Sequence, residues 1–100
     1  MYIINKERGN GKTYELIKDS YKMQIPILCF SKQNAKFIKD KANRELGLEI
    51  LEPICIDDLE SLHGLDIKEV LIDELDYCLS SLIGYKVAGA TLSGQILNKI

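Results

Sequence analysis

Short apolar runs alternate with segments of helical periodicity along this chain. The runs Tyr2–Ile4, Ile25–Phe30 and Val70–Ile72 are too short for helices and each ends at a polar residue, so they predict buried strands. Residues 54–56 predict a shorter strand, and residues 86–92 predict a last one. The chain is therefore expected to contain about five strands.

Helices are predicted between these strands. Apolar residues recur at helical spacing over residues 13–23, with lysines on the opposite face. A second helix is expected to start at Ser31, a good N-cap residue, and to run to residue 46. Asp57 followed by a glutamate three residues later is a capping-box pattern for a short helix ending at Gly64, and residues 75–83 predict one more helix.

The alternation of strands and helices with short connections indicates the α/β class. We expect a three-layer α/β/α arrangement around a mostly parallel sheet of about five strands, with right-handed crossovers. The chain has 100 residues, 46% of them apolar, which is enough material for one core. Residues 1–100 are therefore expected to form a single domain.

Charge is distributed unevenly along the chain. Residues 1–46 contain ten basic and five acidic residues, whereas residues 47–100 contain three basic and ten acidic ones. The formal net charge of −2 does not favour a polyanionic partner for the molecule as a whole.

Cys29, Cys55 and Cys78 lie far apart among apolar neighbours. Their odd number and their spacing argue against a disulfide framework and against a zinc site. The sequence shows no leader-like segment and no apolar run near the roughly 18 residues that a membrane span requires. These observations predict a cytoplasmic protein that does not cross a membrane.

A glycine-bearing stretch, ERGNGKTYEL, occupies residues 7–16, between the first predicted strand and the first predicted helix. Gly9 and Gly11 can adopt backbone conformations closed to other residues, which lets several N–H groups of residues 9–13 point at one anion. Lys12 adds a positive charge for the β- and γ-phosphates of a nucleotide, and the Thr13 hydroxyl can bind Mg²⁺. The stretch therefore predicts a triphosphate site.

The match to a phosphate-binding loop is incomplete. The full pattern, G-x-x-x-x-G-K-[ST], places a glycine where this chain has Lys6. The alternative is a short glycine-rich turn that only caps a helix. The position of the stretch between a strand and a helix is the context that a phosphate-binding loop requires, and it favours the functional interpretation.

An acidic pair, Asp73-Glu74, follows directly after the apolar run that ends at Ile72. Ligands of parallel α/β sheets bind beyond the carboxyl ends of the strands, so this pair is expected on the same edge as the glycine-bearing stretch. Negative charge is unfavourable there unless a cation is present, and Mg²⁺ bound to phosphate would be that cation. Asp73 would hold it through water, and Glu74 would orient and deprotonate an attacking water. The alternative is a solvated acidic loop that caps the next helix.

Together, these motifs resemble those of P-loop ATPases of the RecA-like type. RGNGKT and VLIDELD are similar to motifs I and II, above all in superfamily 1 and 2 helicases and phage terminase large subunits. AGATLSG resembles helicase motif III, and ILCFSKQNAKFI falls where motif Ia would lie. The resemblance covers nearly the whole chain, with the motifs in the expected order.

The resemblance implies roles for individual residues. It makes Lys12 the phosphate-binding and catalytic lysine and Glu74 the candidate base, and it assigns Thr13 and Asp73 to the magnesium ion. Asp76 would bridge motifs, and Thr91 or Ser93 would sense the nucleotide state. The residues implied in nucleotide binding are Arg8, Gly9, Asn10, Gly11, Lys12, Thr13 and Thr91.

The same resemblance implies a partner. Helicases and related motors close two lobes or two subunits around the nucleotide, and an arginine from the far side stabilises the transferred charge. This chain accounts for one lobe and has two arginines, Arg8 and Arg44, so the arginine is expected from a second copy or from another protein. Hydrolysis by the isolated chain is expected to be slow or absent. Lysines on the second predicted helix could touch nucleic acid, although a solvated lysine face is the commoner explanation.

The sequence thus predicts a P-loop protein that binds ATP or another NTP with Mg²⁺. It would act as a weak nucleoside triphosphatase on assembly or with a partner, in phage DNA metabolism or packaging, since the chain resembles small phage proteins rich in lysine and isoleucine. The alternative is a non-hydrolysing nucleotide-binding regulator, or a phage-encoded inhibitor that acts through protein–protein binding. A kinase is disfavoured, because no arginine-rich lid or acceptor pocket is recognisable in the sequence.

Overall fold

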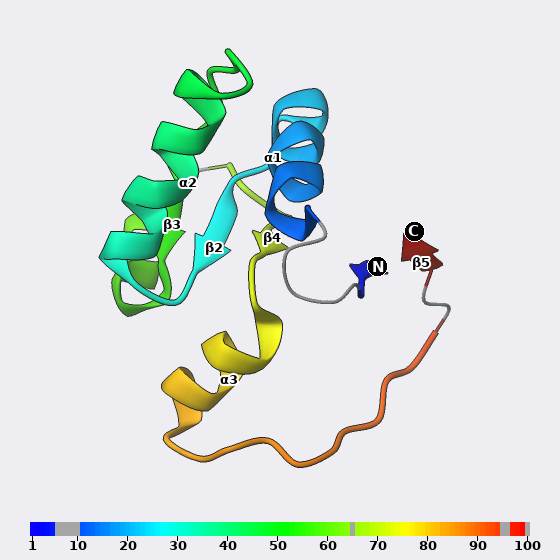
Figure 1. Ribbon diagram of the computed structural model, residues 1–100. Helices are drawn as coiled ribbons and strands as arrows, with labels where there is room; N and C mark the ends of the chain where they lie inside the picture. Colours follow the sequence, from blue (N-terminus) through cyan, green and yellow to red (C-terminus); the bar gives the residue numbers. More distant parts are fainter. Residues whose placement is uncertain (6–10, 65, 95–96, 100) are drawn as a thin grey trace.

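A computed structural model describes residues 1–5, 11–64, 66–94 and 97–99 of the chain. Short strands alternate with helices along these residues, which confirms the predicted α/β class (Figure 1). The elements are β1 (Tyr2–Ile4), α1 (Lys12–Met23), β2 (Ile27–Cys29), α2 (Lys32–Arg44), β3 (Ile54–Cys55), η1 (Ile56–Leu62, a 3₁₀ helix), β4 (Leu71–Ile72), α3 (Leu75–Ile83) and β5 (Leu97–Lys99).

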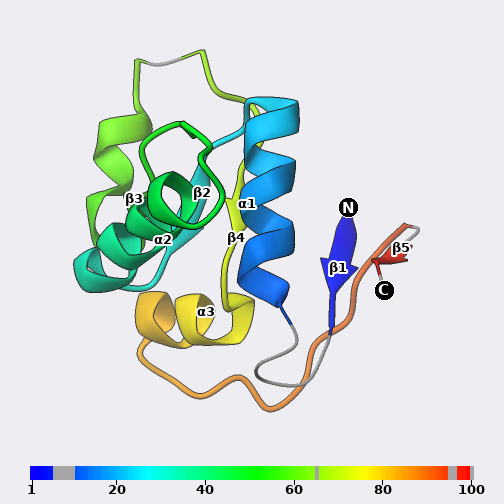
Figure 2. The ribbon, with the colours of Figure 1, turned by 45° about the horizontal axis from the view of Figure 1, so that its top comes forward.

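The central sheet has three parallel strands in the order β3-β2-β4. In its register Leu28 pairs with Ile54 on one side and with Ile72 on the other. β1 pairs with β5, also in parallel, in a separate two-stranded sheet (Figure 2). The described strands therefore form two sheets, not the single sheet of about five strands that the sequence predicted.

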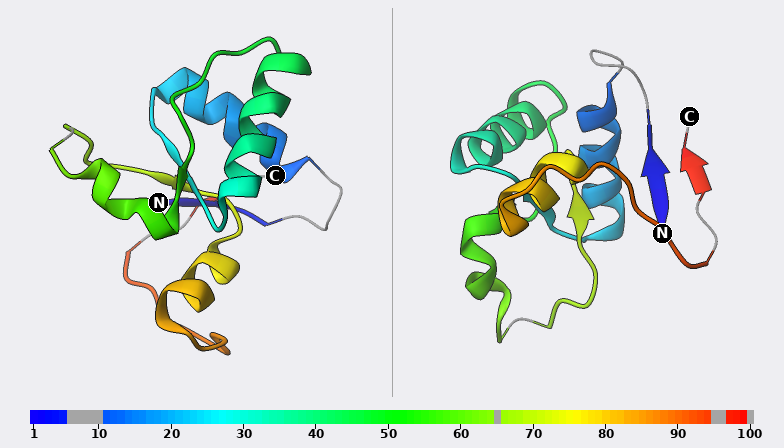
Figure 3. Two further views of the ribbon diagram at one scale, coloured as in Figure 1. Left: turned by 90° about the vertical axis from the view of Figure 1, so that its left-hand side faces the viewer. Right: turned by 90° about the horizontal axis from the view of Figure 1, so that it is seen from below.

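Helices cover both faces of the central sheet, because the side chains of β2 alternate between two cores. Ile27 and Cys29 pack with residues of α1 and α2, whereas Leu28 packs with Ile56 of η1 and Cys78 of α3. An edge-on view shows α1 and α2 on one side of the strands and α3 on the other (Figure 3). All three β2 residues are buried, as expected of a strand covered on both faces.

The prediction of a strand over residues 86–92 was wrong. These residues have no regular secondary structure and are exposed except for Val87, which is half-buried. Ala88, Gly89 and Ala90 have too little apolar surface to stabilise another strand by burial. The strand that follows α3 in the described residues is β5, which the sequence left unassigned.

The cap of α2 was predicted correctly, whereas that of η1 was not. Ser31 precedes α2, and its Oγ accepts a hydrogen bond of 3.0 Å from the backbone N–H of Asn34. η1 instead begins directly after β3, so Asp57 lies inside its first turn and no side chain caps it. The backbone departs from helical geometry at Asp58, which interrupts the short helix.

Among the helices of the described residues, none has the length and apolar character that crossing a bilayer requires.

Candidate functional site

The candidate site lies where β2 and β4 end. The chain leaves β2 into the residues that start α2, and it leaves β4 into the acidic pair. The backbone N–H of Asp73 donates to the carbonyl of Leu28 at 2.9 Å, which fixes Asp73 beside the end of β2. Both turns therefore open at the same edge of the sheet, where parallel α/β proteins bind ligands.

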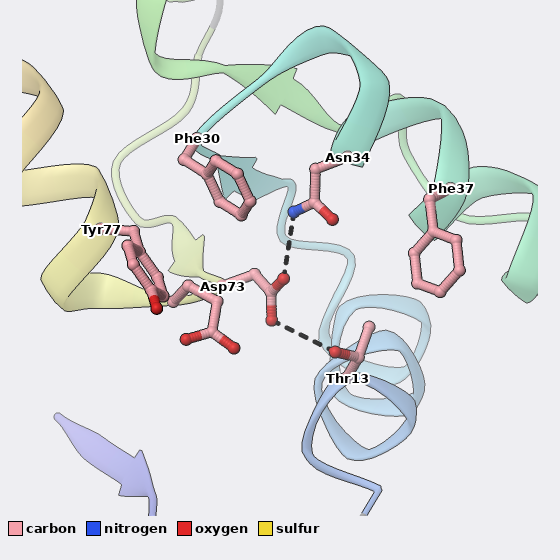
Figure 4. A pocket seen from close by; sticks show the side chains of 7 residues that line it. Thr13, Phe30, Asn34, Phe37, Asp73 and Tyr77 are labelled. Carbon is pink, nitrogen blue, oxygen red and sulfur yellow. Dashed lines mark hydrogen bonds between the residues drawn. The ribbon is translucent and has the colours of Figure 1, made fainter. Parts of the chain in front are cut away.

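Asp73 joins three elements at this edge. Its Oδ1 lies 3.5 Å from the Thr13 hydroxyl of α1, which donates a long hydrogen bond, and its Oδ2 accepts one of 3.2 Å from Asn34 Nδ2 of α2 (Figure 4). Cys78 Sγ of α3 lies 3.4 Å from the backbone carbonyl of Asp73. The Asp73 side chain is only 8% exposed and forms no ion pair with any cation in the described ranges.

Thr13 reaches this carboxylate because α1 begins sharply after the glycine-bearing stretch. Gly11 precedes the helix with a φ of 78°, a left-handed conformation that glycine adopts at little cost. Lys12 and Thr13 then form the first turn, whose backbone N–H groups and helix dipole favour an anion. Lys12 makes no ion pair within the part of the chain that the structure describes.

Glu74 follows with an unusual backbone. Its φ of 56° and ψ of 64° are left-handed, and it precedes α3 without a capping hydrogen bond from its side chain. Asp73 is thus buried and not solvated, and Glu74 stands at the N-cap position of α3 without a capping hydrogen bond from its side chain.

A hollow of about 540 Å³ opens beside these carboxylates. Its described lining combines aromatic rings with polar and acidic groups: Thr13, Phe30, Asn34, Phe37, Asp73, Glu74 and Tyr77. Figure 4 shows Phe30 and Tyr77 on one side of Asn34 and Asp73, and Phe37 on the other. Sites of this size, with apolar walls and a few convergent polar groups, are typical of small-molecule binding.

The structure brings together some of the residues singled out in the sequence. Thr13 and Asp73 meet although 60 positions separate them, and Glu74 lines the same hollow. Thr91 is exposed in the irregular segment after α3 and is not among the described residues that line the hollow. Arg8, Gly9 and Asn10 lie outside the described residues.

Sequence reasoning missed Asn34 and the aromatic walls. Asn34 is the third residue of α2, and Phe30 is the first residue after β2. Their positions directly after a strand that neighbours β4 could have indicated the same sheet edge, but the strand order was needed to see it. Tyr77 in the first turn of α3 carries no such signal.

The side-chain oxygen atoms of Thr13 and Asp73 are suitable ligands for Mg²⁺. This ion prefers oxygen ligands at about 2.0–2.1 Å and usually takes only one or two from the protein, the rest being water and phosphate. The Thr13 hydroxyl donates its proton to Asp73, so its lone pairs remain free for a cation. The described residues contain no group of three or more His, Cys, Asp or Glu side chains arranged for a metal, so an all-protein metal cage is not what this edge offers.

The cysteine nearest this edge is not poised for chemistry. Burial raises the pKa of the Cys78 thiol to about 11, with the nearby Asp73 carboxylate adding to the shift. Burial likewise raises the pKa of Cys29 to about 11. Both thiols are therefore protonated at neutral pH and behave as small apolar side chains.

Part of the basic face of α2 is used within the molecule. Lys39 pairs with Glu52, and Lys41 pairs with Glu45 at 3.5 Å. The Lys41 ammonium also lies 4.5 Å from the ring centroid of Tyr14 and 4.7 Å from that of Phe37. Lys39 and Lys41 are thus engaged in contacts within the molecule.

Comparison with protein-family models, with curated proteins and with solved structures gives no significant match.

Proposed function

We propose that this chain binds a nucleoside triphosphate with Mg²⁺ at the edge formed by Lys12, Thr13 and Asp73. The triphosphate would lie along the glycine-bearing stretch and the first turn of α1. ATP is the leading candidate, because the motifs resemble those of RecA-like P-loop ATPases. The proposal also implies that the α/β domain is a P-loop NTPase fold.

The observation that carries the proposal is the approach of Thr13 to Asp73. A hydroxyl at a helix N-terminus and a buried carboxylate meet across 60 residues of sequence. Among the described residues, the side-chain donors to this buried carboxylate are the neutral Thr13 and Asn34; such a carboxylate is costly, and a divalent cation would offset that cost. Gly11 and the first turn of α1, from which Thr13 reaches Asp73, supply backbone N–H groups that favour phosphate.

Each residue would have a distinct task. Thr13 Oγ1 would bind the cation directly, Asp73 would hold it through water, and Lys12 would pair with the phosphates. The cation would neutralise phosphate charge and polarise the phosphoryl group. Glu74, which lines the hollow next to Asp73, would accept the proton of an attacking water.

The proposal predicts a Mg²⁺-dependent nucleotide affinity that depends on these side chains. Lys12→Ala should weaken ATP binding by about 10- to 100-fold, since a charged hydrogen bond contributes about 1.5–3 kcal/mol. Thr13→Val and Asp73→Asn should each abolish most of the gain in affinity that Mg²⁺ provides. Isothermal titration calorimetry with ATP, GTP and ADP, with and without Mg²⁺, measures these effects.

Lys18→Ala is the matched control for this experiment. Lys18 is exposed on the same helix, so its loss changes the net charge equally without touching the site. Equal loss of affinity in Lys18→Ala and Lys12→Ala would mean that ATP is attracted only by general charge. An ATP affinity that is unchanged in both Lys12→Ala and Asp73→Asn would contradict the proposal.

A second candidate function is the non-hydrolysing regulator that acts through protein binding. The observation that favours it is α3, where Leu75, Leu79, Leu82 and Ile83 are each 38–54% exposed. A helix with so many exposed apolar residues is typical of a protein-binding surface. The partner could be a second copy or another protein, and in the hydrolytic case it would supply an arginine.

Phosphate release separates these two functions. If the chain hydrolyses ATP, Glu74→Gln should lower the rate by about 10²- to 10⁴-fold while ATP still binds. A regulator that does not hydrolyse should show the same negligible phosphate release before and after this substitution. A malachite-green assay with concentrated protein, together with light scattering for mass, makes the measurement.

A further inference from the structure

The aromatic walls of the hollow are not explained by phosphate or metal binding. Phe30, Phe37 and Tyr77 are 37%, 51% and 51% exposed, and the first two are the only phenylalanines in the chain. Exposing large rings to water forfeits the burial that would otherwise stabilise the fold. Their gathering around one polar hollow indicates a ligand with an apolar, ring-binding surface.

Two of these rings form one wall. The ring centroids of Phe30 and Tyr77 lie 5.8 Å apart with an interplanar angle of 43°, a tilted contact that supports both side chains. Phe37 stands across Asn34 and Asp73 from them (Figure 4), and the Lys41 ammonium lies 4.7 Å from its centroid. A planar ring can therefore lie against an aromatic wall while its edge faces Asn34 and Asp73.

The polar groups of the hollow offer hydrogen-bond acceptors. The Asn34 amide nitrogen is used by Asp73, whereas its Oδ1 accepts no hydrogen bond from the residues that the structure describes. Asp73 and Glu74 add carboxylate oxygens. A ligand edge with N–H donors would satisfy these acceptors.

The charges of the hollow discriminate between ligand classes. Its described lining has two carboxylates and no lysine or arginine, which disfavours a polyanionic strand that brings no cation with it. An organic cation would meet the ammonium of Lys41, which already lies over Phe37. An uncharged ring is repelled neither by the carboxylates of the hollow nor by the ammonium of Lys41.

We propose that this hollow binds an uncharged nucleoside, whose base packs against the wall of Phe30 and Tyr77 and donates an N–H to Asn34 Oδ1. This ligand is a second molecule: it would contact Phe30, Tyr77 and Asn34, and would leave Thr13, Asp73 and Glu74, which line the same hollow, to the triphosphate and its magnesium ion. The inference stands on the aromatic walls and on Asn34, so it does not depend on the triphosphate proposal.

Calorimetric titration with adenosine, in the absence of triphosphate and Mg²⁺, tests the proposal on the full chain. Saturable binding is expected, and Phe30→Leu and Tyr77→Leu should each weaken it by about 5- to 150-fold, the range for loss of a base-stacking ring. Tyr21→Leu is the matched control, because Tyr21 is 46% exposed on α1 and does not line the hollow. Absence of binding, or equal binding by all three variants, would overturn the proposal.

Changing the ligand provides a second test, which uses the unsubstituted protein and so does not depend on whether a variant folds. Purine riboside lacks the exocyclic amine and should bind roughly tenfold more weakly than adenosine. A short poly-dA oligonucleotide that binds much more tightly than adenosine would show a nucleic-acid site instead. Guanidinium or choline that displaces adenosine would show a cation site, and either result would reject the nucleoside.

The two proposed sites can fail separately. Lys12→Ala should leave adenosine affinity unchanged, and adenosine should still bind when ATP with Mg²⁺ is present at saturation. If ATP displaces adenosine, the hollow holds the base of the triphosphate itself and the second-ligand proposal is wrong. If ATP does not bind at all but adenosine does, only the triphosphate proposal is lost.

Discussion

At the scale of single residues, Glu74 combines a strained backbone with a place in the hollow. Left-handed geometry costs a side-chain-bearing residue about 1–2 kcal/mol, and glycine avoids most of that cost. Besides Glu74, with a φ of 56°, one other non-glycine residue of the described chain has a positive φ: Gln24 at the end of α1, with 57°. Strain of this kind tends to persist where a side chain is needed for function.

We therefore predict that Glu74→Gly stabilises the fold. The substitution should relieve the left-handed strain, raise the free energy of unfolding by about 1 kcal/mol and raise the melting temperature by about 4–8 °C. Differential scanning calorimetry checks this. A lower melting temperature would mean that contacts of the Glu74 side chain outweigh the strain.

Gln24→Gly is the control for this prediction. Gln24 has a φ of 57° and is exposed, far along the chain from the acidic pair. It should give a similar gain in stability but leave nucleotide binding and phosphate release unchanged. Of the two substitutions, only Glu74→Gly should both stabilise the fold and lower the rate of ATP hydrolysis.

Single residues also show how far the sequence could predict the site. Thr13 and Asp73 could be paired in advance, because each follows a recognisable pattern of strand, turn and helix. Asn34 could not, because its approach to Asp73 depends on β2 and β4 being neighbours, which is set by tertiary packing. Phe30 was predicted only as the end of a strand, and nothing in the sequence pattern singled out Tyr77.

At the scale of elements, β2 is the strand around which the rest is organised. Cys29 of β2 packs in the core beneath α1 and α2, and Cys78 of α3 packs in the core on the other face. Their side chains are fully or almost fully buried, so the pKa of each thiol reflects the burial on one face of the sheet.

The buried thiols predict a loss of stability at alkaline pH. Burial raises the pKa of Cys29 and Cys78 to about 11 in the folded protein, from about 9. Below pH 9 both states keep the thiols protonated and the contribution is complete; between pH 9 and 11 the unfolded chain ionises first, so stability falls. Each thiol can contribute at most about 1.4 kcal/mol per pH unit.

Urea unfolding under reducing conditions at pH 8, 9 and 10 measures this loss. Cys78→Ala should lower stability at pH 8 because it leaves a small cavity, but it should also reduce the decline between pH 9 and 10. An unchanged decline would assign the alkaline effect to other groups, such as Tyr2, whose pKa is also raised by burial and by its hydrogen bond to Asp19.

Elements predicted from apolar periodicity were mostly found, whereas those that depend on distant partners were not. Helix α3 has the predicted bounds, and α1 and α2 begin within one residue of the predictions. Residues 86–92 contain apolar residues but no strand, since a strand needs a neighbour of matching register and these residues have none. β5 was overlooked because its partner, β1, lies at the other end of the chain.

At the scale of the whole molecule, the site is assembled from parts of the central unit that converge at Asp73. Thr13 of α1 and Asn34 of α2 each donate to Asp73, which directly follows β4, and α3 contributes Tyr77 to the hollow. Tyr77 of α3 lines the hollow and other apolar residues of the same helix are exposed, so a protein bound around Tyr77 would lie next to any ligand in the hollow. Site and partner surface would then be neighbours.

The pairing of β1 with β5 also has a mechanical consequence. The two strands run in the same direction, with Tyr2 opposite Leu97 and Ile4 opposite Lys99. Tension between Tyr2 and Lys99 would pull the strands along their length, so that it loads all their hydrogen bonds together instead of unzipping them one by one. This small sheet would resist stretching first and shield β2, β3 and β4 from the applied force.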